Sequence, residues 1–150
     1  MWTVNPQNDT LEGLVNYICK NAQDYLAVAG VRYRFEIPPQ LPAKSIAPEV
    51  RHNVFLASKE AVTNVVRHAK ADSAWIRLRL EPSSFTLEIE DNGRGIAGMD
   101  AEAAQRRNGL KNMRKRMEDI GGSFRIIPGG EGGALVCLKV PLVTSQAERT

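Results

Sequence analysis

The chain has 150 residues, of which 43% are hydrophobic and 25% charged, and its net charge is +3. This length and balance fit one globular domain with its own core, and no apolar run approaches the about 20 residues that a membrane helix needs. The two cysteines, Cys19 and Cys137, are too few for a disulfide framework, so we expect a reducing, cytosol-like compartment. Because the first residues lack basic and apolar regions, we expect no signal peptide.

Three elements are predicted in the first half of the chain. Apolar residues at helical spacing predict a helix over residues 9–29, with Asp9 or Thr10 at its start and Gly30 at its end. Alternating apolar residues predict a strand at 31–37, and three prolines then interrupt the chain. A second long helix is expected over residues 47–70.

The second half alternates between strands and one helix. Alternating apolar residues predict four strands, at residues 76–80, 85–90, 124–127 and 134–140. The first two carry outward arginines and glutamates, which we expect to pair across the strands. Residues 96–108 are small and polar and predict a loop, and residues 109–120 predict a third helix. The order predicts an α/β (α+β) two-layer sandwich: one mixed, largely antiparallel sheet with about three helices on one face.

The first candidate site lies on the second predicted helix, in the stretch KEAVTNVVRH. Glu60, Asn64 and His68 recur at every fourth residue, which places them on nearly one face of an α-helix. A carboxylate and an amide oxygen at this spacing suit Mg²⁺, and Arg67 and His68 are placed to meet phosphate oxygens. The alternative is an exposed polar stripe on a helix that packs against the sheet.

The second candidate site follows a predicted strand and reads DNGRGI, from Asp91 to Ile96. A carboxylate at a strand end can accept a hydrogen bond from an exocyclic amine, and Gly93 and Gly95 let the backbone approach a flat ring. The alternative is a tight turn closed by the aspartate side chain. A dinucleotide-binding loop also matches this glycine spacing, but the preceding strand alternates, whereas that fold begins with a strand buried on both faces.

The third candidate site is the stretch from Asn108 to Met113, where Gly109 is expected to open the third helix. Free N–H groups at a helix start can receive phosphates, Lys111 adds positive charge, and the preceding loop could close over a ligand. The alternative is a plain junction from which Leu110, Met113 and Met117 pack into the core.

A run of cations crowds the same segment, at Arg106, Arg107, Lys111, Arg114, Lys115 and Arg116. A solvated helix face is the preferred interpretation. A phosphorylated ligand is the second, and nucleic-acid binding is weakly supported because no stacking aromatics interleave the run.

Together, in order and spacing, these motifs resemble the ATP-binding catalytic domain of sensor histidine kinases, within the GHKL superfamily that has the Bergerat fold. Glu60 to Ala71 resembles the N-box, Asp91 to Ile96 the first glycine box, and Asn108 to Met113, running on to Gly121 and Gly122, the second; Gly132 and Gly133 resemble a third. The resemblance covers about residues 10 to 142. We therefore expect a linker at 1–8, the catalytic domain at 9–142 and a tail at 143–150.

The resemblance implies ATP and Mg²⁺ as ligands and assigns roles to residues of this chain. Asn64 is implied to coordinate Mg²⁺, with Glu60 as a further catalytic residue that helps to hold the metal or orients a water. Asp91 is implied to bind the adenine amino group. The remaining implied nucleotide contacts are Arg67, His68, Lys70, Gly93, Gly95, Ile96, Gly109, Leu110, Lys111 and Met113.

Residues 96–108 would be the ATP lid. There are two departures from the family pattern: Arg107 stands where a glycine is common, and Ala134 stands where Thr or Ser is common.

The resemblance also implies an activity and partners. We expect a protein-histidine kinase domain that donates the γ-phosphate to a His on a dimerisation domain absent from this chain, and that cannot phosphorylate itself. A response regulator of helix-turn-helix type is the expected partner, without direct contact with nucleic acid or membrane, in the cytoplasmic part of a membrane-anchored sensor. The alternatives are a stand-alone serine kinase of the anti-sigma type and a non-catalytic ATP-sensing module.

Overall fold

The structure is a computed structural model that describes residues 10–93, 103–130 and 132–142. Its helices are α1 (Leu11–Ala29), α2 (Pro48–Asn64), a π-helical turn η2 (Val65–Ala69) and α3 (Ala103–Asp119). Its strands are β1 (Arg32–Glu36), β2 (Ser73–Glu81), β3 (Ser84–Asp91), β4 (Ser123–Pro128) and β5 (Ala134–Pro141). The predicted linker at 1–8 and tail at 143–150 lie outside the described residues.

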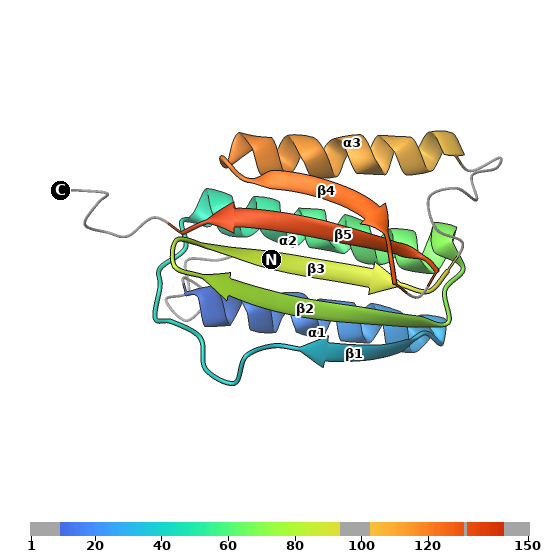
Figure 1. The fold of residues 1–150 in the computed structure, drawn as a ribbon, viewed down its shortest axis with the longest axis horizontal. Helices are drawn as coiled ribbons and strands as arrows, with labels where there is room; N and C mark the ends of the chain where they lie inside the picture. Colours follow the sequence, from blue (N-terminus) through green and yellow to red (C-terminus); the bar gives the residue numbers. More distant parts are fainter. Residues whose placement is uncertain (1–9, 94–102, 131, 143–150) are drawn as a thin grey trace.

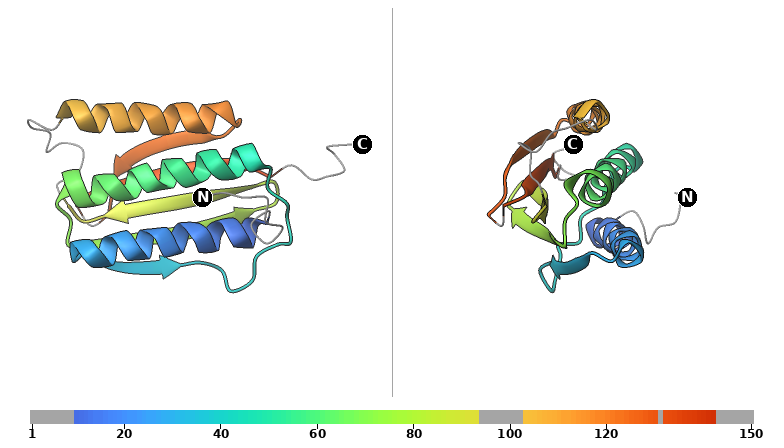
Figure 2. Two further views of the ribbon diagram at one scale, coloured as in Figure 1. Left: turned by 180° about the vertical axis from the view of Figure 1, so that it is seen from behind. Right: turned by 90° about the vertical axis from the view of Figure 1, so that its right-hand side faces the viewer.

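The strands form one mixed sheet with the order β1-β2-β3-β5-β4 (Figure 1). β1 pairs with β2 in parallel, and the other neighbouring strands are antiparallel. The helices lie together on one side of the sheet, as the end-on view in Figure 2 shows. The predicted fold class, a two-layer sandwich with a largely antiparallel mixed sheet, is therefore confirmed.

Local sequence signals set the ends of α1. The Thr10 side chain accepts a hydrogen bond from the Gly13 N–H at 3.0 Å, as an N-cap residue does. At the other end Gly30 adopts a left-handed conformation with φ of 77°, and its N–H bonds to the Ala27 carbonyl at 3.1 Å. Leu14, Ile18 and other residues of the apolar face of α1 are buried against the core.

The core lies between the helices and the inner face of the sheet. Its largest fully buried side chains include Phe85, Leu87 and Ile89 of the central strand β3. On the outer face, Arg77 lies opposite Glu88 and Arg79 opposite Thr86. Glu88 bonds both arginines, at 3.4 Å to Arg77 and 2.7 Å to Arg79, which confirms the predicted arginine–glutamate pairing.

Two helix boundaries differ from the prediction. α3 begins at Ala103 rather than at 109, because residues 103–107 (Ala-Ala-Gln-Arg-Arg) are strong helix formers despite lacking an apolar period. The second predicted helix, 47–70, is α-helical only to Asn64 and ends in the π-helical turn η2. Both differences fall at the candidate site.

Candidate functional site

Asn64 is the last residue of α2 and is 5% exposed. Within the part of the chain that the structure describes, neither its Oδ1 nor its Nδ2 has a hydrogen-bond partner, although both atoms are buried. Leaving a buried polar group unsatisfied costs about 1–3 kcal/mol. An amide kept at this position despite that cost has the properties expected of a ligand-binding group, and its oxygen fits the donor set that Mg²⁺ takes.

The π-helical turn changes the direction of the residues after Asn64. A π-helix bonds each residue to the fifth along rather than the fourth, so the backbone of η2 departs from the α-helical spacing that Glu60 and Asn64 follow. Arg67 is exposed and lies with Lys59 and Thr63 in the lining of a hollow of about 470 Å³ between α1 and α2. The side chain of His68 lies outside what the structure describes, so the last step of the predicted file from Glu60 to His68 stays a prediction.

Lys70 follows η2 with φ of 56° and ψ of 45°, and it is the one non-glycine residue with positive φ in the described chain. This left-handed conformation costs about 1–2 kcal/mol for a residue with a Cβ. The exposed Lys70 turns the chain from the end of η2 toward β2. Strained backbone positions of this kind concentrate at functional sites.

Asp91 ends β3 and is 5% exposed. Its Oδ1 accepts a hydrogen bond from the Gly93 N–H at 2.8 Å, which is the aspartate-closed turn expected as the plainer alternative. The turn and a ligand-binding role are compatible, because a carboxylate has several lone pairs. Gly95 and Ile96, also predicted here, lie outside the described residues.

Asn92, which the sequence analysis did not single out, joins this turn to the end of the N-box. Its Oδ1 accepts from the N–H groups of Asp72 and Ser73, both at 2.9 Å. Gly93 packs so tightly against the Ala69 carbonyl that a Cβ built on it would overlap that group. The last residues of η2 and the turn after β3 are therefore in direct contact, and Figure 1 shows both at the same end of the molecule.

Gly109 lies inside α3 rather than at its start, so its N–H is not one of the free groups at a helix N-terminus. The prediction that a helix opens at Gly109 is therefore wrong, and the contact of Gly109 with a nucleotide stays a prediction. Gly109 instead faces α2, where a Cβ built on it would overlap the Glu60 carboxylate. The carboxylate of Glu60, which lies one turn before Asn64 on α2, is therefore packed against α3.

The other residues of this third motif differ in their exposure. Met113 and Met117 are fully buried, and Leu110 packs partly against the core, which confirms the expected packing of this helix face. Lys111 is exposed. The contacts of Leu110, Lys111 and Met113 with a nucleotide stay predictions.

A glycine-rich turn between β4 and β5 completes the surroundings of Asp91. A Cβ built on Gly133 would overlap the main-chain and side-chain oxygens of Asp91, so only a glycine fits this contact. Gly133 was noted in the sequence as part of a third glycine motif but not as a site residue. The signal that could have identified it is the repeated glycine immediately before a strand that pairs with β3.

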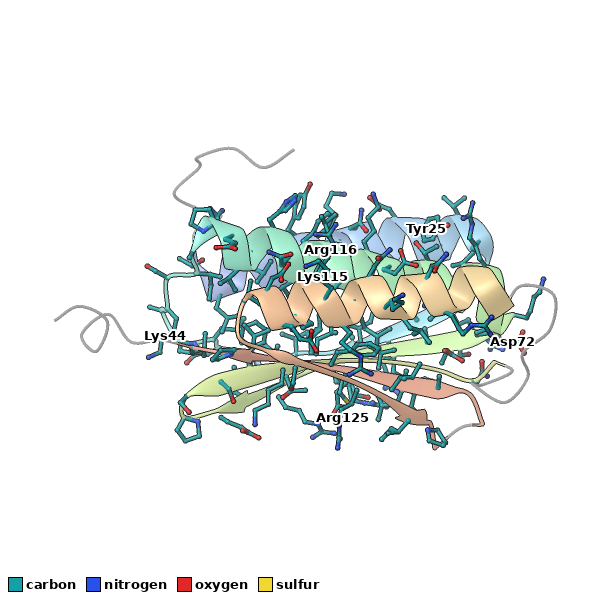
Figure 3. The ribbon with its side chains drawn as sticks, turned by 90° about the horizontal axis from the view of Figure 1, so that it is seen from above. Tyr25, Lys44, Asp72, Lys115, Arg116 and Arg125 are labelled. Carbon is teal, nitrogen blue, oxygen red and sulfur yellow. The ribbon has the colours of Figure 1, made fainter. Side chains whose placement is uncertain are left out.

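The cationic segment makes contacts within the protein. The Arg114 guanidinium lies 5.1 Å from the centre of the Phe124 ring, Lys115 is 3.5 Å from Asp119, and Arg116 donates to Asn53 at 3.3 Å. Figure 3 shows Lys115 and Arg116 on the helical layer and Arg125 on the opposite, open face of the sheet. These contacts favour a helix face with structural cations over a continuous nucleic-acid surface.

Comparison with known sequences gives the family. Residues 49–144 match the histidine kinase-, DNA gyrase B-, and HSP90-like ATPase family, over most of the chain and across the motifs described above. The chain belongs to this family. As a member of an ATPase family, it is an ATP-binding domain.

Relatives of the domain include sensor proteins. The chain is 34% identical over 93 residues to the sensor protein VraS of Staphylococcus saprophyticus, covering 62% of this chain and 26% of VraS. It is 32% identical to VraS of Staphylococcus aureus over the same share of each chain. The chain therefore spans about a quarter of the length of these relatives.

Solved structures share the fold of this ATPase-family domain. The ATP-binding domain of PrrB from Mycobacterium tuberculosis superposes with a TM-score of 0.65 at 20% identity, covering 87% of this chain and 95% of that one. The histidine kinase domain of the blue-light activated histidine kinase from Erythrobacter litoralis gives 0.66 at 19% identity, covering 86% and 61%. At these identities the likeness concerns the fold.

Two features are absent from the residues that the structure describes. None of the helices there has the length and hydropathy required to cross a membrane. No group of three or more His, Cys, Asp or Glu side chains in the same ranges is arranged to hold a metal ion.

Proposed function

We propose that this domain is the ATP·Mg²⁺-binding catalytic domain of a two-component sensor histidine kinase. In the full-length protein it would transfer the γ-phosphate to a His on a dimerisation domain, from which a response regulator, of helix-turn-helix type, would then receive it. The observation that supports this most strongly is the buried, unpartnered amide of Asn64 within a member of this ATPase family. The similarity to sensor proteins supports the assignment to signalling.

In this proposal the residues bind and orient the nucleotide. Asp91 accepts a hydrogen bond from the adenine amino group, which distinguishes adenine from guanine, because guanine presents a carbonyl at that position. The Asn64 oxygen holds Mg²⁺, which when bound neutralises charge on the phosphates. Arg67, Lys70 and Lys111 supply further positive charge to the triphosphate, and His68 contacts the phosphates or the nucleotide. Phosphoryl transfer then depends mainly on positioning and electrostatic stabilisation.

Glu60 has one of two roles that experiment can separate. It lies one turn before Asn64 and against Gly109, so it is placed either to help hold the metal or to orient the attacking group. A Glu60→Gln variant that needs more Mg²⁺ for ATP binding would assign it to the metal. Unchanged Mg²⁺ dependence with slower phosphoryl transfer would assign it to orientation of the attacking group.

The proposal is tested first by nucleotide binding. We expect wild type to prefer ATP over GTP in the presence of Mg²⁺, Asn64→Ala to lose the Mg²⁺ dependence of binding, and Asp91→Asn to lose the preference for adenine. Isothermal titration calorimetry measures all three. Equal affinity of wild type for the two nucleotides would contradict the assignment of Asp91.

The reaction is tested by adding the phosphoacceptor. With γ-labelled ATP, we expect acid-labile phosphohistidine only when a dimerisation domain is supplied, because neither His52 nor His68 lies in a phosphoacceptor sequence. Label on His52 or His68 would contradict this expectation. Transfer to a serine of an added protein would instead indicate a serine kinase, and ATP binding without any transfer would indicate a sensing module. We place the domain in the cytoplasm, where ATP is available, without membrane contact of its own.

A further inference from the structure

Glu90 is a buried carboxylate next to Asp91 that has no role in the function proposed above. It is 5% exposed and lies on the outer face of β3, because neighbouring residues of a strand point to opposite faces. Its Oε1 accepts from Arg77 Nη2 at 2.6 Å. Its Oε2 accepts from the main-chain N–H of Gly130 at 2.8 Å. Each carboxylate oxygen therefore holds a different part of the fold.

The bond to Gly130 fixes one side of the turn between β4 and β5. Gly129 packs against the same carboxylate, since a Cβ built on it would lie 2.9 Å from Glu90 Oε2. The Gly129 N–H donates to the Gly133 carbonyl at 2.8 Å, which closes the turn. Glu90 is thus linked through the turn to Gly133 by contacts that leave room only for small residues.

The other side of the same turn contacts Asp91. Gly133 packs directly against the main-chain and side-chain oxygens of Asp91, as described above. A shift of the turn toward or away from β3 would therefore change the space beside the Asp91 carboxylate. Glu90 controls that shift from the opposite face of the sheet, because it holds the turn at Gly130.

Arg77 holds Glu90 in place. Besides Glu90, it contacts Glu88 at 3.4 Å and Glu36 at 3.1 Å, so the guanidinium is fixed between three carboxylates on two strands, β1 and β3. Hydrogen bonds between charged groups are short and directional, so the Arg77 guanidinium and the Glu90 carboxylate are held in one arrangement. Glu90 therefore gives the glycine turn a fixed attachment point on the sheet.

We propose that Glu90, fixed by Arg77, is a positioning residue that sets the adenine preference of the domain by holding the glycine turn, formed by Gly129, Gly130, Gly132 and Gly133, against Asp91. Glu90 does not touch the nucleotide and acts through Gly130 and Gly133. The inference rests on the proposed adenine-binding role of Asp91. It adds a specificity determinant on the face of the sheet opposite the nucleotide.

The test compares Glu90→Gln with Glu88→Gln in the 150-residue protein. Glu88 is a matched control because it is buried on the same strand and face as Glu90. It bonds Arg77 and Arg79, but among the described residues it makes no hydrogen bond to the glycine turn. Arg77 and Gly130 bond different oxygens of Glu90, and in glutamine one of these two atoms is an NH₂ donor, so in this geometry it cannot accept from both. The readouts are the affinities for Mg²⁺-ATP and Mg²⁺-GTP by calorimetry and the melting temperature.

For Glu90→Gln we expect ATP affinity to fall about fivefold, which corresponds to losing the hydrogen bond between Asp91 and the adenine amino group. GTP affinity should change little, because guanine does not make that bond. The ATP-to-GTP ratio should therefore fall about fivefold. Glu88→Gln should keep the wild-type ratio within twofold, even if its melting temperature falls as much. The double variant Glu90→Gln/Asp91→Asn should show no further loss of the ratio beyond Asp91→Asn alone, because both act on one contact.

An unchanged ratio in Glu90→Gln, or an equal loss in Glu88→Gln, would overturn the inference. If Glu90→Gln does not fold, Glu90→Asp keeps the charge for Arg77 but withdraws the carboxylate from Gly130, and the same ratio decides. Failure of the proposed function gives a different result: wild type would show no ATP preference, or Asp91→Asn would retain it.

Discussion

Because the side-chain amide of Asn64 is buried without a hydrogen-bond partner, we expect this residue to lower the stability of the nucleotide-free protein. We consider the substitution Asn64→Leu, which keeps the branching of the side chain and removes both polar atoms. Two buried unsatisfied groups cost about 1–3 kcal/mol each, and placing the larger leucine in the same space costs about 1–3 kcal/mol. The net expectation is a stabilisation of about 1–2 kcal/mol without nucleotide. For a chain of 150 residues this raises the melting temperature by roughly 2–8 °C.

Nucleotide should reverse this order of stability. A ligand at 100 times its Kd stabilises the folded state by about 2.7 kcal/mol, and Asn64→Leu should not gain that increment because it cannot hold the metal. Wild type is therefore expected to be less stable than Asn64→Leu without Mg²⁺-ATP and more stable with it. Thermal denaturation followed by circular dichroism, with and without Mg²⁺-ATP, measures both differences.

Asn53 provides the matched control on the same helix. It is 7% exposed, its Nδ2 donates to the Glu49 carbonyl at 2.9 Å, and its Oδ1 accepts from Arg116 at 3.3 Å. Because these bonds are made, Asn53→Leu should destabilise the protein by about 1–3 kcal/mol and leave ATP binding unchanged. If Asn64→Leu is destabilised to the same extent as Asn53→Leu, the amide of Asn64 is satisfied in the free protein and our reasoning is refuted.

Three further predictions follow from the site and its surroundings. Gly109→Ala should change the free energy of unfolding by less than about 1 kcal/mol in urea titrations, because the Glu60 carboxylate that the new Cβ overlaps can move aside and alanine favours the helix by about 1 kcal/mol; in a Glu60→Ala background, which removes the overlap, the same substitution should be stabilising. Lys70→Gly should raise the free energy of unfolding by about 0.5–1 kcal/mol in the same titrations, because glycine relieves the left-handed conformation; a loss of stability would contradict this. Burial raises the pKa of the Cys19 thiol to about 11, so iodoacetamide should label it at pH 8 far more slowly in the native than in the unfolded protein. The folded state then holds the thiol proton more tightly than the unfolded state, so stability should fall as pH rises from about 9 to about 11.

The features of the fold that depend on neighbouring residues could be predicted from the sequence. The Thr10 and Gly30 ends of α1 are encoded within a few residues, and the pairing of Arg77 and Arg79 with Glu88 follows from the alternation of two adjacent strands. The π-helical turn could not be predicted, because no residue pattern specifies a bond to the fifth residue along. The start of α3 was missed because residues 103–108 favour a helix by propensity alone, without an apolar period.

The candidate site shows the same division between local and distant information. Asn64 and Asp91 could be identified because each lies in a short motif whose order along the chain is characteristic. The contribution of Asn92 depends on Asp72, 20 residues earlier, and that of Glu90 on Gly130, 40 residues later. Contacts at these separations are created by strand pairing and are not visible in the local pattern.

The glycines explain why three motifs that are individually weak identify a site when they occur together. Gly93 packs on the end of η2, Gly109 on Glu60 of α2, and Gly133 on Asp91 of β3, so each glycine touches a different motif from its own. A side chain at Gly93 or Gly133 would overlap backbone atoms and separate two of the elements that form the site, whereas one at Gly109 would displace the Glu60 carboxylate. The spacing of the motifs along the chain is therefore a consequence of the fold, because each glycine has to lie beside a carboxylate or a carbonyl of another motif. A chain with the same motifs in another order would have the same residues but would lack these three contacts.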